Sequence, residues 1–491
     1  MCKTSFSLSL TRLKNIFWPI ENKELKKFLP MGSMLFCILF NYTAFRAIKD
    51  GFIVTSVGPE AIGFLKTYAV LPSAIVMTIL YTKLCNIMNQ QRVFYTITSS
   101  FLLYITCFAL ILYPNADFFH PDPDKIHLLS TQYPSFKWFI RIVGCWSYAS
   151  FYIVAELWGN MILGLLFWQF ATQITSISEA KRFYPMLGLI GNCSLLGVAL
   201  VIGLLLNNKI QLIPEHLRFI PILLITIANG VVILFLYNNL NTRIFLDNSL
   251  EKQVIKNKIV TPKLGVKDSI KMIFTSKYLG LLAILVIAYG VSINLVEGVW
   301  KSKIRDMYPT KEKYTLFMSV FQAYQGIAAI IFMLIGSNIL RNVSWRTAAI
   351  LTPIMMGITG IIFFIFIFLD NISITGVTIF TGSGSLFIAI IIGSIQNILT
   401  KATKYSLFDS TKEMVYMTVD NELRTKGKAA VDVVASRGGK SIGGIVQSTF
   451  FILLPNTTFS DASPFFAILF FITLLLWILA IKTLNKKMQN Y

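Results

Sequence analysis

Long apolar runs separated by short polar stretches dominate the pattern of this chain. Met31–Ile48 and Phe465–Ile481 are two examples. An apolar run of about 18 residues or more crosses the hydrocarbon core of a bilayer as a helix, because a helix bonds its own backbone groups where no water is present. The pattern therefore predicts an all-α membrane protein. The alternating strand-like segments that a membrane barrel needs are not found.

Twelve such runs follow one another, in two sets of six. We expect spans near residues 31–49, 61–82, 93–113, 138–176, 183–206, 218–239, 278–298, 314–338, 347–369, 374–400, 429–454 and 463–482. The run at 138–176 is ambiguous, since one helix of that length would measure about 60 Å, twice the thickness of the hydrocarbon core. It is either one long helix that projects into the cytoplasm or two spans.

The charges of the loops set the orientation. Lysine and arginine gather before residue 28, in the connection 240–277 and after residue 481, whereas the loop 114–137 holds three aspartates. Loops rich in lysine and arginine stay in the cytoplasm, so both termini and the central connection are expected there. This needs an even number of spans, which favours one element at 138–176 and twelve spans in total.

The chain is expected to consist of two six-helix halves joined and flanked by cytoplasmic segments. The boundaries are 1–27 for the N-terminal segment, 28–239 for the first half, 240–277 for the basic connection, 278–482 for the second half and 483–491 for the tail. A repeat supports the halves, because an offset of 247 takes Tyr42, Asp50, Gly51 and Lys66 to Tyr289, Glu297, Gly298 and Lys313. Parallel six-helix halves are the plan of major-facilitator transporters, which bind solute between the halves.

Composition supports a membrane protein and limits its partners. Hydrophobic residues make up 55% of the 491 residues and charged residues 14%, whereas soluble chains carry about 25% charged residues. The net charge of +21 is spread over many short loops, which favours membrane topology over nucleic-acid binding. The six cysteines form no CxxC pair or Cys/His cluster, so we expect no zinc site, no disulfide framework and no cofactor.

Ionisable residues inside the apolar runs are the candidate functional residues, because a charge at membrane depth needs a partner or a wet cavity. Tyr42, Arg46 and Lys49 are spaced four and three apart and share one helical face, and Asp50 follows them. Arg46 and Lys49 could hold phosphate oxygens. The alternative is that Lys49 and Asp50 end the helix and reach into the lipid headgroups.

Two acidic residues lie in other runs. Glu156 is deep in the stretch 138–176, where it could pair with a cation, bind a proton, or accept a hydrogen bond from a ribose or base. Glu297 occupies the repeat position of Asp50, and its alternative role is a salt bridge to Lys301, four residues on. Lys301 itself begins a short basic stretch on the predicted outer side, which could attract an anion.

A glycine-rich segment near the C-terminus contains Lys440. Gly439-Lys440-Ser441 resembles the end of a phosphate-binding P-loop, but Val434 stands where that loop needs its first glycine and no strand precedes it. This disfavours a soluble-type NTPase and leaves a glycine-rich, closely packed helix that carries one buried lysine. Three further lysines near span ends are expected to reach into the headgroups instead, namely Lys66, Lys401 and Lys404.

Taken together, these segments resemble the non-mitochondrial ATP/ADP translocases of obligate intracellular bacteria and plastids, and the Rickettsia-like members look nearest. The similar stretches are Phe45–Gly51, Ile153–Gly159, Asn294–Lys301, Lys404–Asp409 and Gly427–Ser441. The resemblance implies a twelve-span carrier of major-facilitator-like architecture, in a bacterial inner membrane, that exchanges host ATP for ADP.

The resemblance also implies that Lys49, Glu156, Glu297 and Lys440 are functionally critical. Where the family often has Leu-Gly-Lys-Ser-Gly-Gly, this chain has Gly438–Gly443. Members of the family also include carriers of other nucleotides and importers coupled to protons. Nucleotide transport therefore follows more firmly than adenine specificity.

The resulting hypothesis is a secondary transporter, not an enzyme. Its halves rock around a central cavity in which Arg46, Lys49 and Lys440 neutralise phosphates, while Glu156 and Glu297 pair with these cations in the empty carrier. The expected partners are ATP, ADP, with or without phosphate, and the lipid bilayer, but no nucleic acid. The alternatives are a carrier of GTP, CTP or UTP, proton-coupled uptake, an anion channel, and a membrane-embedded lipid enzyme, for which no nucleophile or metal cluster is found at a recognisable spacing.

Overall fold

The computed structural model describes residues 20–206, 214, 217–246, 276–371, 383–416, 431 and 436–488. Most of the predicted cytoplasmic segments, at 1–19, 247–275 and 489–491, lie outside these residues. Within the described part all regular structure is helical. This confirms the predicted all-α class.

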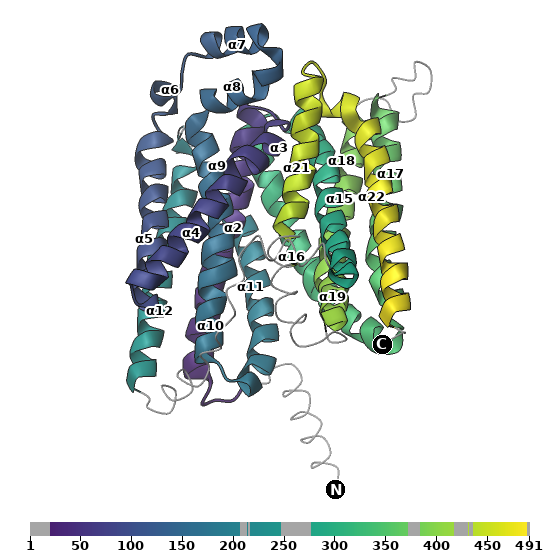
Figure 1. Ribbon diagram of the computed structural model, residues 1–491. Coiled ribbons are helices and arrows are strands. Elements are labelled where there is room, and N and C mark those ends of the chain that lie inside the picture. The colour runs from purple at the N-terminus through teal and green to yellow at the C-terminus, as the bar shows by residue number, and fades with distance from the viewer. Residues whose placement is uncertain are drawn as a thin grey trace. The chain divides into compact units, whose positions relative to one another are not determined.

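The described elements follow one another as helices of very different length (Figure 1). They are α2 (Leu25–Ser56), α3 (Ala61–Phe64), η1 (Leu65–Val70), α4 (Leu71–Ile87), α5 (Gln90–Cys107), η2 (Phe108–Leu112), α6 (Ala116–Phe119), α7 (Pro123–Gln132), η3 (Pro134–Phe136), α8 (Lys137–Gly144), α9 (Trp146–Trp158), η4 (Gly159–Phe167), α10 (Trp168–Ile174), α11 (Ile177–Leu206), α12 (Ile220–Leu246), α15 (Lys277–Met307), α16 (Lys311–Asn342), α17 (Trp345–Asn371), α18 (Ser383–Thr403), η6 (Lys404–Phe408), α19 (Asp409–Tyr416), α21 (Ser436–Leu453) and α22 (Phe459–Met488).

Eleven segments of the described chain are long and apolar enough to cross a membrane. They are built on α2, α3–η1–α4, α5–η2, α9–η4–α10, α11, α12, α15, α16, α17, α18–η6–α19 and α22. The apolar part of α21, Ser441–Leu453, is shorter. The predicted span 429–454 begins among residues that are not described, so the number twelve and the two repeats stay predictions.

The ambiguous stretch 138–176 contains one span preceded by a separate short helix. Helix α8 ends at Gly144, and Cys145 leaves the helical conformation with φ −117° and ψ 43°. The following segment, Trp146–Ile174, is a single candidate span. The stretch therefore holds one candidate span, and the expectation of one uninterrupted helix over 138–176 is wrong. The physical reason is that α8 has a strongly amphipathic surface, which does not suit a lipid-crossing segment.

The chain forms two compact units. The first consists of Met1–Arg46, Thr78–Pro114 and Val154–Val260, and the second of Ala47–Met77, Asn115–Ile153 and Thr261–Tyr491. Three of the five boundaries between them fall inside α2, α4 and α9. The predicted division into halves at 28–239 and 278–482 stays a prediction.

In the first unit, helix α12 packs against α5, and the two run side by side in Figure 1. The rings of Phe94 and Tyr237 stack there with centroids 3.7 Å apart. Buried polar groups join the other helices, because the Asn41 amide donates to the Thr226 carbonyl at 2.8 Å and the Trp158 indole donates to the Ile38 carbonyl at 3.2 Å. These bonds satisfy groups that would be costly to bury unpaired.

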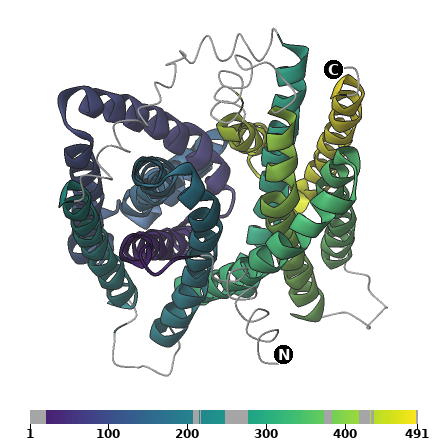
Figure 2. The same cartoon turned by 90° about the horizontal axis from the view of Figure 1, so that it is seen from below.

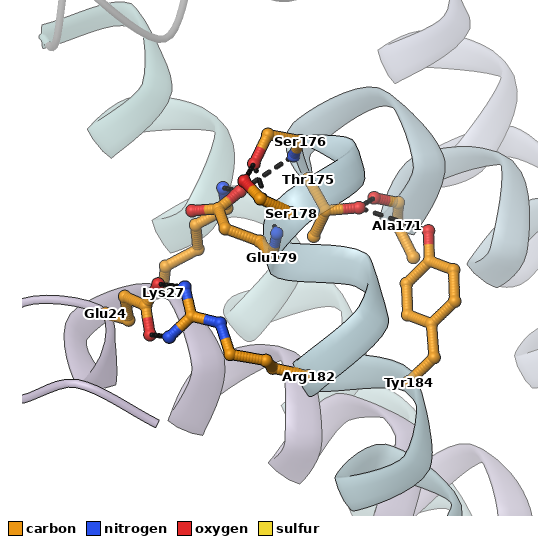
Figure 3. A network of polar contacts seen from close by, with 9 residues as sticks. All are labelled: Glu24, Lys27, Ala171, Thr175, Ser176, Ser178, Glu179, Arg182 and Tyr184. Atoms are coloured by element: carbon orange, nitrogen blue, oxygen red, sulfur yellow. Dashed lines mark hydrogen bonds and ion pairs between the residues drawn. The ribbon is translucent and has the colours of Figure 1, made fainter. Parts of the chain in front are cut away.

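A polar network ties the start of α2 to the start of α11 in the same unit (Figure 3). Ser176 and Glu179 form a capping box, in which the Ser176 N–H donates to Glu179 Oε2 at 2.7 Å and the Glu179 N–H donates to Ser176 Oγ at 3.3 Å. Glu179 also pairs with Lys27 of α2 at 2.8 Å. Arg182 holds both carboxylate oxygens of Glu24. This two-pronged contact fixes the first turn of α2.

In the second unit, α15 lies among α18, α21 and α22 (Figure 1 and Figure 2). The glycines of α21 allow this packing. A Cβ on Gly439 would meet backbone of Ile287 at 2.9 Å, and one on Gly443 would meet Asn294 at 2.8 Å. Gly444 lies against the carbonyl of Gly63 in α3, where a Cβ would be 3.2 Å away. The expectation that these glycines permit close helix approach is confirmed.

Candidate functional site

Asp50 of α2 lies between two lysines in the interior of the second unit. Its Oδ1 is 2.7 Å from Lys49 Nζ, and its Oδ2 is 2.9 Å from Lys301 Nζ of α15. Lys49 and Asp50 are each 3% exposed and Lys301 is 5% exposed. The carboxylate thus has one ammonium partner for each oxygen, one from its own helix and one from α15.

The packing of α2 explains why these charges are buried. The helix continues past Asp50 to Ser56, and the next residue, Gly51, lies so close to α16 that a Cβ would be 2.2 Å from Thr315 Oγ1. The Lys49 ammonium lies 3.9 Å from the centre of the Tyr152 ring, a cation–π contact. The alternative that Lys49 and Asp50 end the helix and reach the headgroups is therefore wrong.

Glu297 of α15 pairs with Lys401 of α18, with Oε1 2.8 Å from Nζ. The side chains are 15% and 11% exposed. Two contacts hold α15 and α18 together here, because the Trp300 indole donates to the Ile390 carbonyl at 3.1 Å and Gly393 lies against the Trp300 ring. The alternative salt bridge from Glu297 to Lys301 is replaced by this pair, since Lys301 binds Asp50 instead. The expectation that Lys401 reaches into headgroups is also wrong.

Lys66 extends the cluster. Its ammonium donates to Asn294 Oδ1 at 2.6 Å, and the same Asn294 side chain donates to the Gly290 carbonyl at 2.7 Å. Gln447 of α21 donates to the Asn294 carbonyl at 2.8 Å. The polar groups of α15 and α21 thus orient Lys66, whose partner is an amide and not a headgroup. Lys404, by contrast, pairs with Asp409 at 2.8 Å and its side chain is 25% exposed.

We call six residues the buried charge cluster: Lys49, Asp50, Lys66, Glu297, Lys301 and Lys401. Both Lys301 and Lys66 lie within electrostatic reach of Glu297, in addition to its partner Lys401. Among these six side chains, lysines outnumber carboxylates by four to two. Chemically, a group of ammonium ions in a medium of low dielectric constant attracts anions much more strongly than the same group does in water.

Of the five residues predicted for the site, Lys49 and Glu297 belong to this cluster. Arg46 and Glu156 belong to the first unit. The Arg46 guanidinium lies 5.7 Å from the centre of the Tyr42 ring, and Glu156 is half-buried on α9. Lys440 is part of α21, but its side chain lies outside the described residues. The grouping of all five at one site stays a prediction.

Asp50's partner Lys301 and Glu297's partner Lys401 are not among the five predicted site residues, although Lys301 begins the basic stretch that could attract an anion. Both are near the ends of apolar runs, where lysine usually reaches the interface. The signal for Lys301 is its place on the predicted outer side, where a basic residue breaks the charge rule, but this signal does not identify Asp50 as its partner. We find no comparable signal for Lys401. Among the described residues, no group of three His, Cys, Asp or Glu could hold a metal ion.

A separate buried carboxylate, Glu60, lies in the second unit between two spans. It is 4% exposed, its Oε1 accepts from the Phe459 N–H of α22 at 3.3 Å, and its Oε2 has no hydrogen-bond partner among the described residues. Burial raises the pKa of the Glu60 carboxyl, and the charges of Arg305 and Lys137 oppose this only in part. The protonated form is therefore favoured more than in an exposed glutamate.

Comparison with known proteins places the chain in a family. The profile of the TLC ATP/ADP transporters matches residues 4–488. The chain is 54% identical to ADP,ATP carrier protein 1 of Rickettsia bellii, over 100% of this chain and 98% of that protein. It is 56% identical to ADP,ATP carrier protein 1 of Rickettsia prowazekii, over 98% and 97% of the two chains.

Solved structures with the same fold are transporters of low sequence similarity. A bacterial homologue of the iron transporter ferroportin, in its inward-facing state, matches with a TM-score of 0.61 and 13% identity over 94% of this chain and 100% of that chain. A variant of the nucleoside transporter NupG matches with a TM-score of 0.57 and 12% identity over 94% and 99%. The chain has the helical fold of major-facilitator-type transporters, and it belongs to the TLC ATP/ADP transporter family.

Proposed function

We propose that this carrier exchanges ATP for ADP across the inner membrane of a bacterium, with both termini in the cytoplasm. Its relatives bear the name ADP,ATP carrier protein. The observation that carries the proposal is the buried charge cluster, in which four lysines and two carboxylates gather on helices of a membrane protein. Charges at this depth are rare and usually mark the path of a solute.

The chemistry of the cluster suits the phosphate chain of a nucleotide. A lysine ammonium acts as a compact point charge for phosphate oxygens, and several lysines together match the several charges of ATP or ADP. The carboxylates Asp50 and Glu297 hold the ammonium groups at 2.7 to 2.9 Å when no phosphate competes for them. A polyanion therefore replaces existing ionic partners and does not have to neutralise isolated charges.

We assign Arg46, Lys49 and Lys440 to phosphate binding, and Glu156 and Glu297 to pairing with the cations of the empty carrier. Transport follows alternating access, in which the predicted halves rock about a central site. ATP carries about one more negative charge than ADP, so inward exchange for ADP is opposed by the membrane potential by about 2.3 kcal/mol per 100 mV. Either nucleotide gradients supply this energy or phosphate leaves together with ADP.

The test uses the purified protein in lipid vesicles. Vesicles loaded with ADP should take up labelled ATP, and vesicles without internal nucleotide should not. Unlabelled GTP, CTP, UTP and inorganic phosphate, added outside in turn, establish the substrate range. Uptake that is indifferent to internal ADP, but follows an imposed proton gradient, would overturn the exchange proposal in favour of proton-coupled import.

A further inference from the structure

We propose that Asp50 makes exchange obligatory. In the empty carrier the Asp50 carboxylate bridges Lys49 and Lys301, and this bridge opens only when a phosphate oxygen replaces the carboxylate as the partner of Lys301. This inference rests on the proposed exchange function. It assigns Asp50 as a positioning residue and Lys301 as a further phosphate ligand.

Lys49, Asp50 and Lys301 all belong to the second compact unit of this structure. The predicted halves divide them differently, and alternating access between those halves would move the two segments relative to one another. Asp50 and Lys49 are on α2, in the predicted half 28–239, and Lys301 is on α15, in the predicted half 278–482. The contact from Asp50 Oδ2 to Lys301 Nζ measures 2.9 Å between side chains that are 4% and 7% exposed. Rocking of the halves about a central site has to separate them.

Separation without a substitute partner is strongly unfavourable. Water does not reach these side chains freely, so an ammonium and a carboxylate pulled apart there lose their attraction and gain little hydration. The cluster can avoid this cost of separating the ammonium from the carboxylate. Asp50 keeps Lys49, which is 2.7 Å from its other oxygen, while Lys301 exchanges the carboxylate for a phosphate oxygen. Every charge then retains a partner as the halves move.

The other cluster pair does not have this property. Glu297 of α15 and Lys401 of α18 both lie in the predicted half 278–482. Rocking of the halves therefore moves them together and leaves the pair intact. Of the two carboxylates in the cluster, Asp50 is therefore the one whose ion pair depends on whether the carrier holds a nucleotide.

The experiment measures release of labelled ADP from loaded vesicles into medium with and without external ATP. The wild type should retain ADP until ATP is added. Asp50→Asn keeps the size of the side chain but cannot pair with Lys301, so it should release ADP into nucleotide-free medium at least about tenfold faster than the wild type, which corresponds to about 1.4 kcal/mol in the barrier. Asp50→Glu, which restores the charge, should recover dependence on external ATP.

Glu179→Gln is the matched control. Glu179 also pairs with a lysine of α2, Lys27, at 2.8 Å, but both residues lie in the predicted half 28–239 (Figure 3). Loss of that pair should leave the dependence on external ATP unchanged. A variant with a purely structural defect would lower exchange and release together, whereas the proposal requires their ratio to change in Asp50→Asn and not in Glu179→Gln.

The outcomes separate the inference from the proposed function. If the wild type itself releases ADP into nucleotide-free medium, exchange as such is wrong. If the wild type exchanges and Asp50→Asn exchanges with the same strict dependence on external ATP, only the role of Asp50 is wrong. Should Asp50→Asn fail to insert, Lys301→Gln breaks the same bridge from the other side. Its ratio of release to exchange should also rise, and an unchanged ratio would overturn the inference.

Discussion

Replacement of Lys401 by methionine tests whether the buried charge cluster is held by specific pairs. Lys401→Met keeps the length and apolar stem of the side chain but removes the ammonium that lies 2.8 Å from Glu297. Glu297 then remains as a carboxylate that is 15% exposed. Its remaining positive neighbours are Lys301 and Lys66, whose charges also act on it.

The expected loss of stability follows from this geometry. Removal of one partner from a buried ion pair costs about 3–5 kcal/mol, because the other charge stays buried. Residual exposure and the two neighbouring lysines reduce the penalty, so we expect about 3 kcal/mol. Lys404→Met is the matched control, since Lys404 makes an equally short contact with Asp409 while the two side chains are 25% and 36% exposed. Exposed pairs contribute about 0–1 kcal/mol.

A double-mutant cycle tests whether Lys401 and Glu297 interact directly. The free energy of unfolding is measured in mild detergent for Lys401→Met, Glu297→Gln and the double variant. A neutral pair of similar size is often as stable as a buried ion pair, so the double variant should be more stable than Lys401→Met alone. A coupling energy indistinguishable from zero would refute the direct pair.

Three further predictions concern transport, packing and pH. Lys49→Gln and Lys440→Gln should each lower ATP uptake by at least about a hundredfold, which equals about 2.7 kcal/mol. The amount of protein in the membrane should stay unchanged. Full uptake by either variant would remove that residue from the site. Gly51→Ala should destabilise the protein by about 1–3 kcal/mol through overpacking, and Thr315→Ala in the same chain should restore the unfolding midpoint, because the hydroxyl is the atom that a Cβ would meet. Burial raises the pKa of Glu60, so the contribution of this group to stability is fully present below the ordinary glutamate pKa and is lost as pH rises through the raised value. Glu60→Gln should flatten this dependence of the unfolding midpoint on pH. A profile that Glu60→Gln leaves unaltered would contradict the assignment.

The sequence predicts the spans well because lipid imposes one requirement on every crossing segment, a long apolar helix. Lys49 and Glu297 could be selected for the same reason, as ionisable residues within such runs. The break at Cys145 could not be foreseen, because Trp138 and Phe139 continue the apolar pattern of the following span. Only the amphipathic arrangement of α8 as a whole distinguishes it from that span.

The partners of the selected residues could not be predicted, because they depend on which helices pack together. Lys301 stands four residues after Glu297, the spacing at which side chains on one helix meet. In the structure, a different helix supplies a carboxylate at 2.9 Å, and the local pair does not form. The contact between Asp50 and Lys301 joins positions about half the chain apart in sequence, and neither residue carries a local signal of it.

The positions related by the 247-residue offset show why the cluster is asymmetric. Asp50 and Glu297 correspond to one another, but the counterpart of Lys301 is Val54 and that of Lys401 is Val154. The second set of helices therefore supplies a lysine to each carboxylate. For Glu297 this partner lies within its own predicted half, and for Asp50 it lies in the other. On the proposed mechanism, a repeat that duplicates the carboxylates but not these lysines would yield one permanent pair and one pair that opens when the predicted halves move.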